Sequence, residues 1–270
     1  MDLFLAGTYS RPFVIEEQYR DMDLFLAETM FGNQSNTIST LGLNPAISIL
    51  ESFYYADEVT EKMIPYFEKF LLDSGAFTFM TSQKNTSIDW DNYVERYADF
   101  INRNKVDLFF ELDIDSIVGI SEVERLRDKL ERLTGKQCIP VWHKSRGKDY
   151  FLRMCNEYSY VSLGGIVSRE FLPNEYKYFP WFIDTAHKHG AKIHGLGFTN
   201  LKGLTKYHFD SVDSTSWTSG NRFGCVYYFD GRTMIKVDRK ANERMVNTRE
   251  LAIHNFNEWV KFQKYAKTYL

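Results

Sequence analysis

Short runs of β-branched and aromatic residues recur along the chain between longer amphipathic stretches. Eight such runs have the length of buried strands: residues 3–6, 48–55, 70–75, 107–113, 138–143, 160–165, 192–197 and 210–214. The stretches between them, such as 90–104 and 121–133, repeat apolar residues at helical spacing. Alternating strands and helices favour parallel strands joined by crossovers, and eight strands favour closure. The sequence therefore predicts an α/β fold, a (β/α)8 TIM-type barrel.

Beyond the eighth predicted strand the chain carries one more amphipathic stretch. Its apolar spacing from 248 to about 269 predicts a C-terminal helix. Ser121 followed by Glu124 has the spacing of a capping box at the start of the helix over 121–133. The segment 30–40, rich in Asn, Ser and Thr, predicts a long loop and is a candidate lid. Because no linker composition interrupts the pattern, we expect residues 1–270 to form a single domain.

Composition and charge narrow the class of protein. With 44% hydrophobic residues, 22 Phe and 17 Tyr, the 270-residue chain has ample apolar material for a core. Its formal net charge is -3, so any contact with nucleic acid must be local. Cys138, Cys155 and Cys225 have neither metal-binding nor disulfide spacing and are typical of reduced thiols. Neither an apolar run of the ~18 residues needed for a bilayer nor the basic start of a signal peptide is present. We therefore expect a cytoplasmic protein without membrane contact.

Acidic residues stand at the ends of three predicted strands. Asp73 ends the third run in LLDSGAF, and Asp213 ends the eighth in FDSVDSTSW. Asp113 and Asp115 end the fourth in FFELDID. The carboxyl ends of barrel strands share one mouth, so we expect these side chains to meet. Paired carboxylates suit glycosyl transfer, in which one attacks an electrophilic sugar carbon and another moves protons. They also suit a divalent metal, or capping by backbone amides in loops.

Glycines follow several of the same strands, in DSGAF, LGGIVSRE and HGLGF. A glycine lets a ligand approach the backbone closely, so these positions suit the floor of a site for a flat heterocycle. Each of them alone also fits an ordinary turn.

Taken together and in order, these strings resemble the tRNA-guanine transglycosylase family. DSGAF at 73–77 looks like the family's DSGG-aromatic motif, ELDID is similar to its acidic fourth-strand motif, and LGGIVSRE resembles its GGLAVGE. KIHGLG resembles its YLMGVG, and SVDST falls where the family has its nucleophile. The resemblance covers roughly residues 73–224, and ordered motifs are far more specific than any single one. It implies a barrel that exchanges a purine base on a nucleic-acid sugar.

The resemblance implies roles for the carboxylates. Asp213 would be the nucleophile that attacks the anomeric carbon of the sugar and displaces guanine. Asp210 is its rival within FDSVD, although it matches the family's preceding acid. Asp73 would be the general acid and base, protonating the departing base and deprotonating the incoming one. Asp113 would accept hydrogen bonds from the donor edge of guanine or a 7-deazaguanine.

The resemblance also implies a set of base-binding positions. Phe77 and His194 occupy the places where the family sandwiches the base, although Phe77 also fits a core position. His143 lies near the family's fifth-strand Gln and would donate to a carbonyl oxygen, while Glu170 would support the site from behind. The implied base contacts beside Asp113 are Ser74, Phe77, His143, Gly164, Gly165, Ile166, His194 and Gly195.

The chain departs from the family's tRNA-acting members in two respects. Residues 214–270 lack their CxCxxC-plus-His zinc motif, so we expect neither a metal nor another cofactor. TSW replaces their PTR string after the nucleophile. A shorter chain without the zinc motif resembles the DNA-guanine transglycosylases of viruses and bacteria, which favours DNA over tRNA as the partner. Candidate phosphate contacts, which also fit a solvated charged surface, are Lys144, Arg146, Lys148, Arg222 and the basic segment 232–244.

The expected activity is therefore replacement of guanine in a nucleic acid, with DNA favoured, by a free 7-deazaguanine base such as 7-cyano-7-deazaguanine. It would proceed through a covalent bond between Asp213 and the sugar, on an extruded or unpaired nucleotide. A virus-encoded enzyme of this kind would work in the host cytoplasm. Three alternatives stay open: the same reaction on tRNA, a glycosidase of free nucleosides, and an inactive barrel that binds nucleic acid. The sequence also leaves the base, the sequence context and the oligomeric state open.

Overall fold

The computed structural model describes residues 1–270 except 9–10, 12, 16–46, 82–87, 219–222 and 239–246. The candidate lid at 30–40 lies outside the described residues, and so do Arg222 and the second half of the basic segment 232–244.

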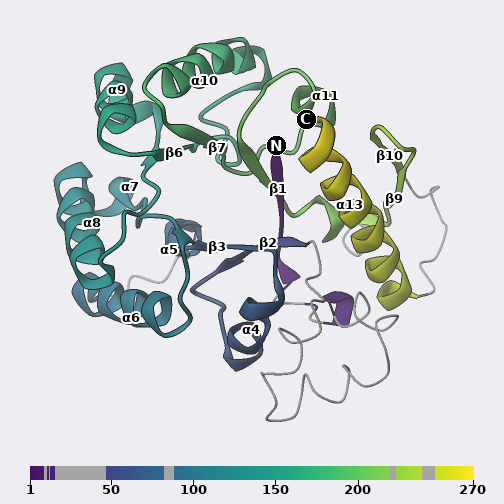
Figure 1. The fold of residues 1–270 in the computed structure, drawn as a ribbon, viewed down its shortest axis with the longest axis horizontal. Coiled ribbons are helices and arrows are strands. Elements are labelled where there is room, and N and C mark those ends of the chain that lie inside the picture. Colours follow the sequence, from purple (N-terminus) through teal and green to yellow (C-terminus); the bar gives the residue numbers. More distant parts are fainter. Residues whose placement is uncertain (9–10, 12, 16–46, 82–87, 219–222, 239–246) are drawn as a thin grey trace.

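The core of the fold is a curled sheet of eight strands, all of them parallel (Figure 1). All eight predicted strands are confirmed, the first one residue longer than predicted and the other seven shorter: β1 (Asp2–Ala6), β2 (Ser48–Ser52), β3 (Lys69–Asp73), β4 (Leu108–Phe109), β5 (Val141–Trp142), β6 (Tyr160–Leu163), β7 (Lys192–Gly195) and β8 (Ser211–Ser214). Their order in the sheet is β4-β3-β2-β1-β8-β7-β6-β5. The first strand therefore pairs with the second and the eighth, as the predicted topology requires.

The sheet is TIM-like, but its ladder is not continuous around a closed barrel. The continuous pairing ends at β4 on one side and at β5 on the other. In the described part of the chain these end strands meet at one isolated parallel bridge, between Phe110 and Ile139. The prediction of an eight-stranded parallel α/β sheet is thus confirmed, whereas its closure into a complete barrel is not: the two ends of the curled sheet touch at a single bridge in the described residues.

Helices lie around the outside of the curled sheet (Figure 1). The described α-helices are α4 (Glu58–Met63), α5 (Ala76–Thr81), α6 (Trp90–Arg103), α7 (Asp115–Val118), α8 (Ile120–Thr134), α9 (Gly147–Glu157), α10 (Phe179–Lys188), α11 (Leu201–Leu204) and α13 (Thr248–Tyr269). Short 3-10 turns connect several elements: η2 (Ile64–Tyr66), η3 (Lys144–Arg146), η4 (Pro173–Tyr178) and η5 (Ser216–Thr218). The helices predicted over 90–104, 121–133 and 248–269 are confirmed as α6, α8 and α13.

Local sequence signals explain where the outer helices begin and end. The carboxylate of Asp89 accepts the backbone N–H of Asn92 at 3.0 Å and caps the start of α6. Gly135 ends α8 with a left-handed backbone (φ 64°). The predicted capping box is wrong, because α8 begins at Ile120 with Gly119 as its N-cap. The carboxylate of Glu124 instead accepts from the hydroxyl of Tyr150 on α9.

The C-terminal helix joins two parts of the fold. A hairpin of β9 (Val226–Phe229) and β10 (Met234–Val237) packs against α13. The helix holds this hairpin through two buried polar side chains, because Asn255 accepts from Tyr227 N at 2.9 Å and Glu258 accepts from Phe229 N at 2.6 Å. Asn247 caps the start of the helix by accepting from Glu250 N.

At the amino ends of the strands, α13 also forms hydrogen bonds with the backbones of β1 and β2. The buried amide of Gln263 accepts from Ser48 N at 3.0 Å and donates to Ser48 O at 2.7 Å and to Leu3 O at 2.5 Å. One side chain thereby satisfies backbone groups of β1 and β2 that would otherwise lose their partners on burial.

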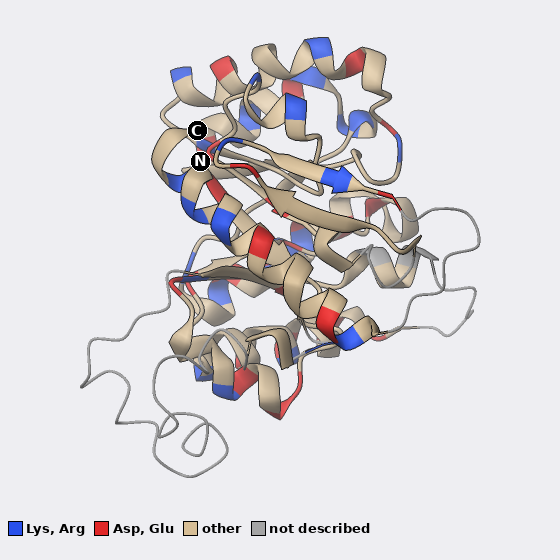
Figure 2. Cartoon of the chain, turned by 90° about the vertical axis from the view of Figure 1, so that its right-hand side faces the viewer, with Lys and Arg blue, Asp and Glu red and all other residues tan. Residues whose placement is uncertain are grey.

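Charged side chains of both signs are interspersed over the described helices (Figure 2). Among the described residues, no helix combines the length and the apolar character needed to cross a membrane. The three cysteines are buried free thiols.

Candidate active site

The carboxyl ends of the strands surround one cavity of about 1300 Å³. Every strand of the sheet contributes a residue from its carboxyl end or from the turn that follows: Gly7, Ser52, Asp73, Asp113, His143, Gly165, Gly197 and Asp213. The four aspartates that the sequence places at strand ends all line this cavity, although they come from β3, the segment after β4, and β8: Asp73, Asp113, Asp115 and Asp213.

Asp213 lies in β8, and its carboxylate is held by two donors. Its Oδ1 atom accepts from the backbone N–H of Gly197 at 2.5 Å and from Nε2 of His194 at 3.2 Å. Asp213 is 8% exposed. Its rival Asp210 stands before the first residue of β8, where it accepts from Ile193 N at 2.8 Å and contacts His187 at 2.9 Å. Of the two acids, Asp213 is therefore the one that faces the cavity.

His194 supports Asp213 from within the sheet. Its side chain is fully buried, with ring centroids 6.2 Å from Phe4 and 5.3 Å from Phe110. Its Nδ1 atom lies 2.5 Å from the hydroxyl of Ser211. The expectation that His194 offers a stacking face to a base is wrong, since its side chain is fully buried and both ring nitrogens have protein partners. The geometry assigns this histidine to orienting the carboxylate of Asp213.

Asp73 ends β3 beside the same cavity and is partly exposed to it. Its Oδ2 atom accepts from Gly75 N at 3.0 Å. Burial raises the pKa of Asp73 to about 7, helped by the negative charges of Asp113 and Asp213. A carboxyl group with this pKa exchanges a proton readily near neutral pH, which is the property required of a general acid and base.

Asp113 follows β4 and belongs to a charged triad. Nε2 of His143 lies 3.2 Å from Asp113 Oδ2, and Nδ1 of the same ring lies 3.1 Å from Glu170 Oε1. Burial opposes the charged imidazolium, but the two carboxylates prevail and raise the pKa of His143 to about 10. The hydrogen bond and charge of His143 lower the pKa of Glu170 to about 2. Within this triad, His143 is therefore positively charged and Glu170 negatively charged near neutral pH.

This pairing changes the role expected for His143. Both of its ring nitrogens donate to carboxylates, so the ring does not donate to a carbonyl oxygen of a bound base as predicted. Gly164 makes room for the ring, because a Cβ there would lie 2.8 Å from His143 Cε1 and 2.8 Å from Val141 Cγ1. Gly164 thus serves the protein's own packing and not a ligand.

Of the remaining predicted base contacts, Gly165 lines the cavity, whereas Ser74, Ile166 and Gly195 are not among its lining residues. Gly165 lines the cavity in a left-handed backbone conformation (φ 78°). Ser74 is fully buried, and its hydroxyl accepts from Ala76 N at 3.4 Å, so its side chain is directed into the fold. Ile166 is buried, and a Cβ at Gly195 would lie 3.3 Å from Phe198 and Phe209. The backbone of Phe77 lies in α5, while its side chain is outside the described residues.

The predicted phosphate contacts are largely engaged by carboxylates. The side chain of Arg146 is 1% exposed and pairs with Glu111 at 2.7 Å and Asp115 at 3.3 Å, which leaves its guanidinium group little access to a phosphate. Lys144 pairs with Glu175 at 2.6 Å but keeps about half of its side chain in solvent. The Lys148 ammonium lies 5.0 Å from the ring centroid of Trp181. Arg222 lies outside the described residues.

Sequence reasoning missed other residues of the cavity. Glu51, at the carboxyl end of β2, lines it and accepts a hydrogen bond from the hydroxyl of Thr8. Tyr55 and Arg11 also line it. The acid within SILES stands at a predicted strand end, so the rule that singled out Asp73 also applies to Glu51.

No group of three or more His, Cys, Asp or Glu side chains in the described ranges is arranged to hold a metal ion. No protein-family model matches the chain, and no curated protein sequence matches it significantly.

Proposed function

We propose that this protein is a base-exchange transglycosylase that replaces guanine in a nucleic acid, with DNA favoured, by a 7-deazaguanine. The observation that carries the proposal is the convergence of Asp73, Asp113 and Asp213 on one cavity in three different environments. One carboxylate is held by donors, one has a pKa of about 7, and one is paired with an imidazolium. Three such groups fit a nucleophile, a proton carrier and a reader of a donor edge.

In the first half of the reaction, a carboxylate oxygen of Asp213 attacks C1′ of the sugar. The bond from C1′ to N9 of guanine breaks, and the electron pair leaves with the base. Asp73 carries a proton for part of the time at neutral pH and delivers it to the departing base. The product is a glycosyl ester on Asp213 and free guanine. The N–H of Gly197 and the ring of His194 hold the attacking carboxylate in place.

The second half reverses these steps with another base. Asp73, now ionised, removes the proton from N9 of the incoming 7-deazaguanine. The nitrogen attacks C1′, and the ester bond to Asp213 breaks, which restores the free carboxylate. Atoms and charges balance over the cycle, so the reaction needs no cofactor beyond the two bases.

Asp113 supports recognition of a guanine-type base. A carboxylate accepts hydrogen bonds, and guanine presents two neighbouring N–H donors at N1 and N2. The imidazolium of His143 lies 3.2 Å from Asp113 Oδ2 and holds that carboxyl group in place. Adenine presents an acceptor at N1 and is disfavoured at this position.

The size of the cavity supports a nucleotide substrate. At about 1300 Å³ it exceeds the roughly 300–1,000 Å³ typical of small-molecule pockets. A target nucleotide must still leave the base stack before its C1′ atom reaches Asp213, which favours unpaired or extruded substrate. The missing zinc motif in 214–270 supports DNA over tRNA.

The proposal is tested by incubating the protein with single-stranded DNA, duplex DNA or tRNA, together with labelled guanine or 7-cyano-7-deazaguanine, and analysing the nucleosides by mass spectrometry. We expect label in DNA and a covalent protein–DNA adduct that is lost in Asp213→Asn. Asp210→Asn is a matched control because Asp210 lies three residues away and outside the cavity lining. Label in tRNA alone would move the assignment to RNA, and no label in any polymer would overturn it.

A second candidate is base exchange or hydrolysis on free nucleosides. It is favoured by the pairing of Arg146 and Lys144 with carboxylates, which weakens the case for phosphate contacts at this rim. Release of base from a mononucleoside, with no reaction on any polymer, would support this candidate over the first.

A further inference from the structure

The two end strands of the sheet, β4 and β5, meet along a seam directly below Asp113 and His143. Backbone pairing crosses this seam at one level, where Ile139 N donates to Phe109 O at 2.8 Å and Glu111 N donates to Ile139 O at 3.1 Å. Above that level the backbone of the β5 strand bonds to β6, since Gly164 N donates to Trp142 O.

A side chain takes the place of the next backbone rung. In a regular parallel ladder the N–H of Val141 would donate to the backbone carbonyl of Glu111. Here it donates to Glu111 Oε1 at 2.8 Å. The carboxylate therefore spans a gap at which the two backbones diverge, and it sets their separation.

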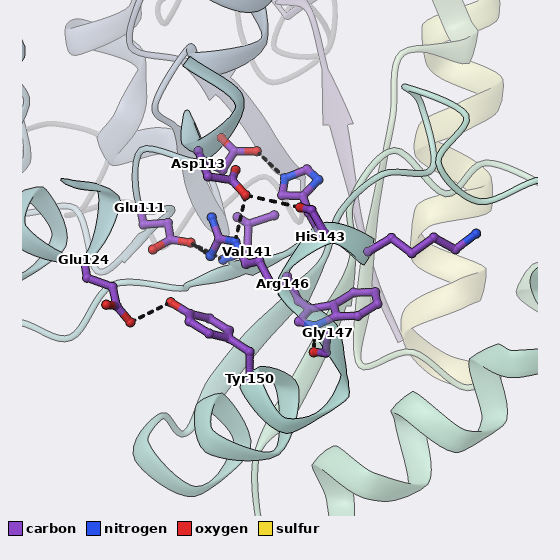
Figure 3. Close-up of polar contacts among 12 residues, drawn as sticks. Glu111, Asp113, Glu124, Val141, His143, Arg146, Gly147 and Tyr150 are labelled. Atoms are coloured by element: carbon purple, nitrogen blue, oxygen red, sulfur yellow. Dashed lines mark hydrogen bonds and ion pairs between the residues drawn. The ribbon is translucent and has the colours of Figure 1, made fainter. Parts of the chain in front are cut away.

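The carboxylate of Glu111 is fixed by two guanidinium groups. It is fully buried, and it pairs with Arg146 Nη1 at 2.7 Å through Oε1 and with Arg127 Nη1 at 3.1 Å through Oε2. Arg146 also reaches Asp115 with its Nε atom at 3.3 Å, so it ties the segment after β4 to the turn after β5. Figure 3 shows this cluster, with Arg146 extending toward the segment that carries Glu111 and Asp113.

The same seam is crossed again one step closer to the cavity. Asp113 is two residues beyond Glu111, and His143 is two residues beyond Val141. The contact of Asp113 with His143, at 3.2 Å, is therefore the next cross-strand contact after that of Glu111 with Val141, at 2.8 Å. In the described part of the chain no backbone bond joins the two strands at this level, so the two side-chain contacts hold the strand ends together.

We propose that Glu111 is a positioning residue that fixes Asp113 against His143 across the seam between β4 and β5, and so sets the geometry in which a base is read. The link to base reading rests on the proposed function. The positioning itself is a property of the folded protein and is measured without any reaction.

The decisive experiment follows the imidazole ¹⁵N signals of His143 through a pH titration of the full chain. In the wild type the ring stays charged until its pKa of about 10. Glu111→Gln removes the charge that anchors the two arginines, so Asp113 moves away from the ring, and we expect the His143 midpoint to fall by at least about one pH unit. Glu258→Gln is the matched control, because Glu258 is also buried and accepts a strand N–H, but lies on α13.

Binding of guanine and of 7-cyano-7-deazaguanine is measured on the same variants. We expect Glu111→Gln to weaken base binding about tenfold while kcat at saturating base changes less than about threefold, because a misplaced Asp113 loses a charge-assisted bond to the base. A role in folding alone would lower the melting temperature and leave both His143 and the base affinity of the folded fraction unchanged.

The outcomes separate the two proposals. A shifted His143 midpoint in a protein that exchanges no base overturns the proposed function and leaves the positioning role intact. An unshifted midpoint with unchanged base affinity overturns the positioning role. If Glu111→Gln does not fold, Glu111→Asp replaces it, because aspartate keeps the charge but is one methylene too short to span the seam, and the same shift is expected.

Discussion

Two aspartate–histidine pairs stand at the carboxyl ends of the sheet: Asp113 and His143 follow β4 and β5, and His194 and Asp213 belong to β7 and β8. In each pair an imidazole Nε2 atom lies 3.2 Å from a carboxylate oxygen, between His143 and Asp113 on one side and between His194 and Asp213 on the other. The pairs differ at the second ring nitrogen. His143 meets the carboxylate of Glu170 there, whereas His194 meets the hydroxyl of Ser211.

This difference separates charge from orientation. The His143 ring lies between two carboxylates, which hold it as an imidazolium, and it contacts both of them. The ring beside a hydroxyl lies fully buried among Phe4 and Phe110 and fixes the direction of the Asp213 carboxylate. Under the proposed function, the pair with Asp113 would serve recognition of the base and the pair with Asp213 would serve the chemistry.

Asp213→Asn should have the largest effect, because it removes the proposed nucleophile from the pair with His194. The amide keeps an oxygen that accepts from Gly197 and His194, but it is no longer a nucleophile. We expect base exchange to fall on the order of 10⁴-fold or more, with base affinity preserved. Initial rates of label incorporation and binding of guanine check both parts. An Asp213→Asn protein with wild-type turnover would move the nucleophile to another residue.

Asp73→Asn should have the second largest effect, because the negative charges of both Asp113 and Asp213 act on the carboxyl group of Asp73. We expect exchange to fall by about 10³-fold through loss of the proton carrier, and the pH dependence near 7 to disappear. Stability should change in the opposite direction. A carboxyl group whose pKa rises on folding from 3.8 to about 7 costs stability as the pH rises through that interval.

We therefore expect Asp73→Asn to be more stable than the wild type at pH 8 by about 1–3 kcal/mol, and equally stable near pH 4. Urea unfolding at the two pH values measures this. Equal destabilisation at both would show that the carboxyl group of Asp73 is not strained in the native state.

Glu170→Gln tests the role of the pair of Asp113 and His143 in recognition of the base. We expect the base KM to rise about tenfold with little change in kcat, since His143 loses one partner and Asp113 its fixed position. The pH dependence follows from the shifts. The raised pKa of His143 contributes stability below 6.5 that is lost as the pH rises toward 10, and the lowered pKa of Glu170 contributes stability above 4.5 that is lost toward pH 2.

The contribution of this pair is therefore complete between pH 4.5 and 6.5. In that window Glu170→Gln should cost about 1 kcal/mol, because the Glu170 side chain is 34% exposed and solvent weakens the interaction. Glu175→Gln, on the same segment, is the control that should leave the base KM unchanged. A kcat effect without a KM effect would contradict the division between the two sides.

Ser211→Ala should have the smallest effect, and on the chemical side. Loss of the hydroxyl beside His194 Nδ1 should lower kcat about threefold and stability by about 1 kcal/mol, with the base KM unchanged. Steady-state kinetics and thermal unfolding measure these changes. A rise in KM comparable to that of Glu170→Gln would mean that the two histidines do the same work.

The sequence was sufficient for the strands and for the meeting of three aspartates. Strand periodicity located all eight strands, and the rule that strand ends share one mouth brought Asp73, Asp113 and Asp213 together. The closure of the barrel was harder to foresee, because pairing between β4 and β5 depends on where the two backbones diverge. The sequence does not reveal this divergence; in the structure it is marked by the contact of Glu111 with Val141 N.

The errors concern which way a side chain points and what it meets. His194 lies on a strand with buried neighbours on both sides, so alternation did not distinguish a cavity-facing ring from a buried one. Arg146 looked like a phosphate contact because its partner Glu111 is 35 residues earlier in the chain, after β4. Gly164 looked like a ligand floor, and only the position of the His143 ring shows what it accommodates.

The bridge made by Gln263 bears on the order in which the molecule can be assembled. The backbone groups it seals belong to Leu3 and Ser48, more than two hundred residues earlier in the chain. During translation β1 is therefore synthesised long before its neighbour β8 and before the side chain of Gln263. The central part of the sheet is completed only after synthesis has passed residue 263, which makes folding late and dominated by long-range closure.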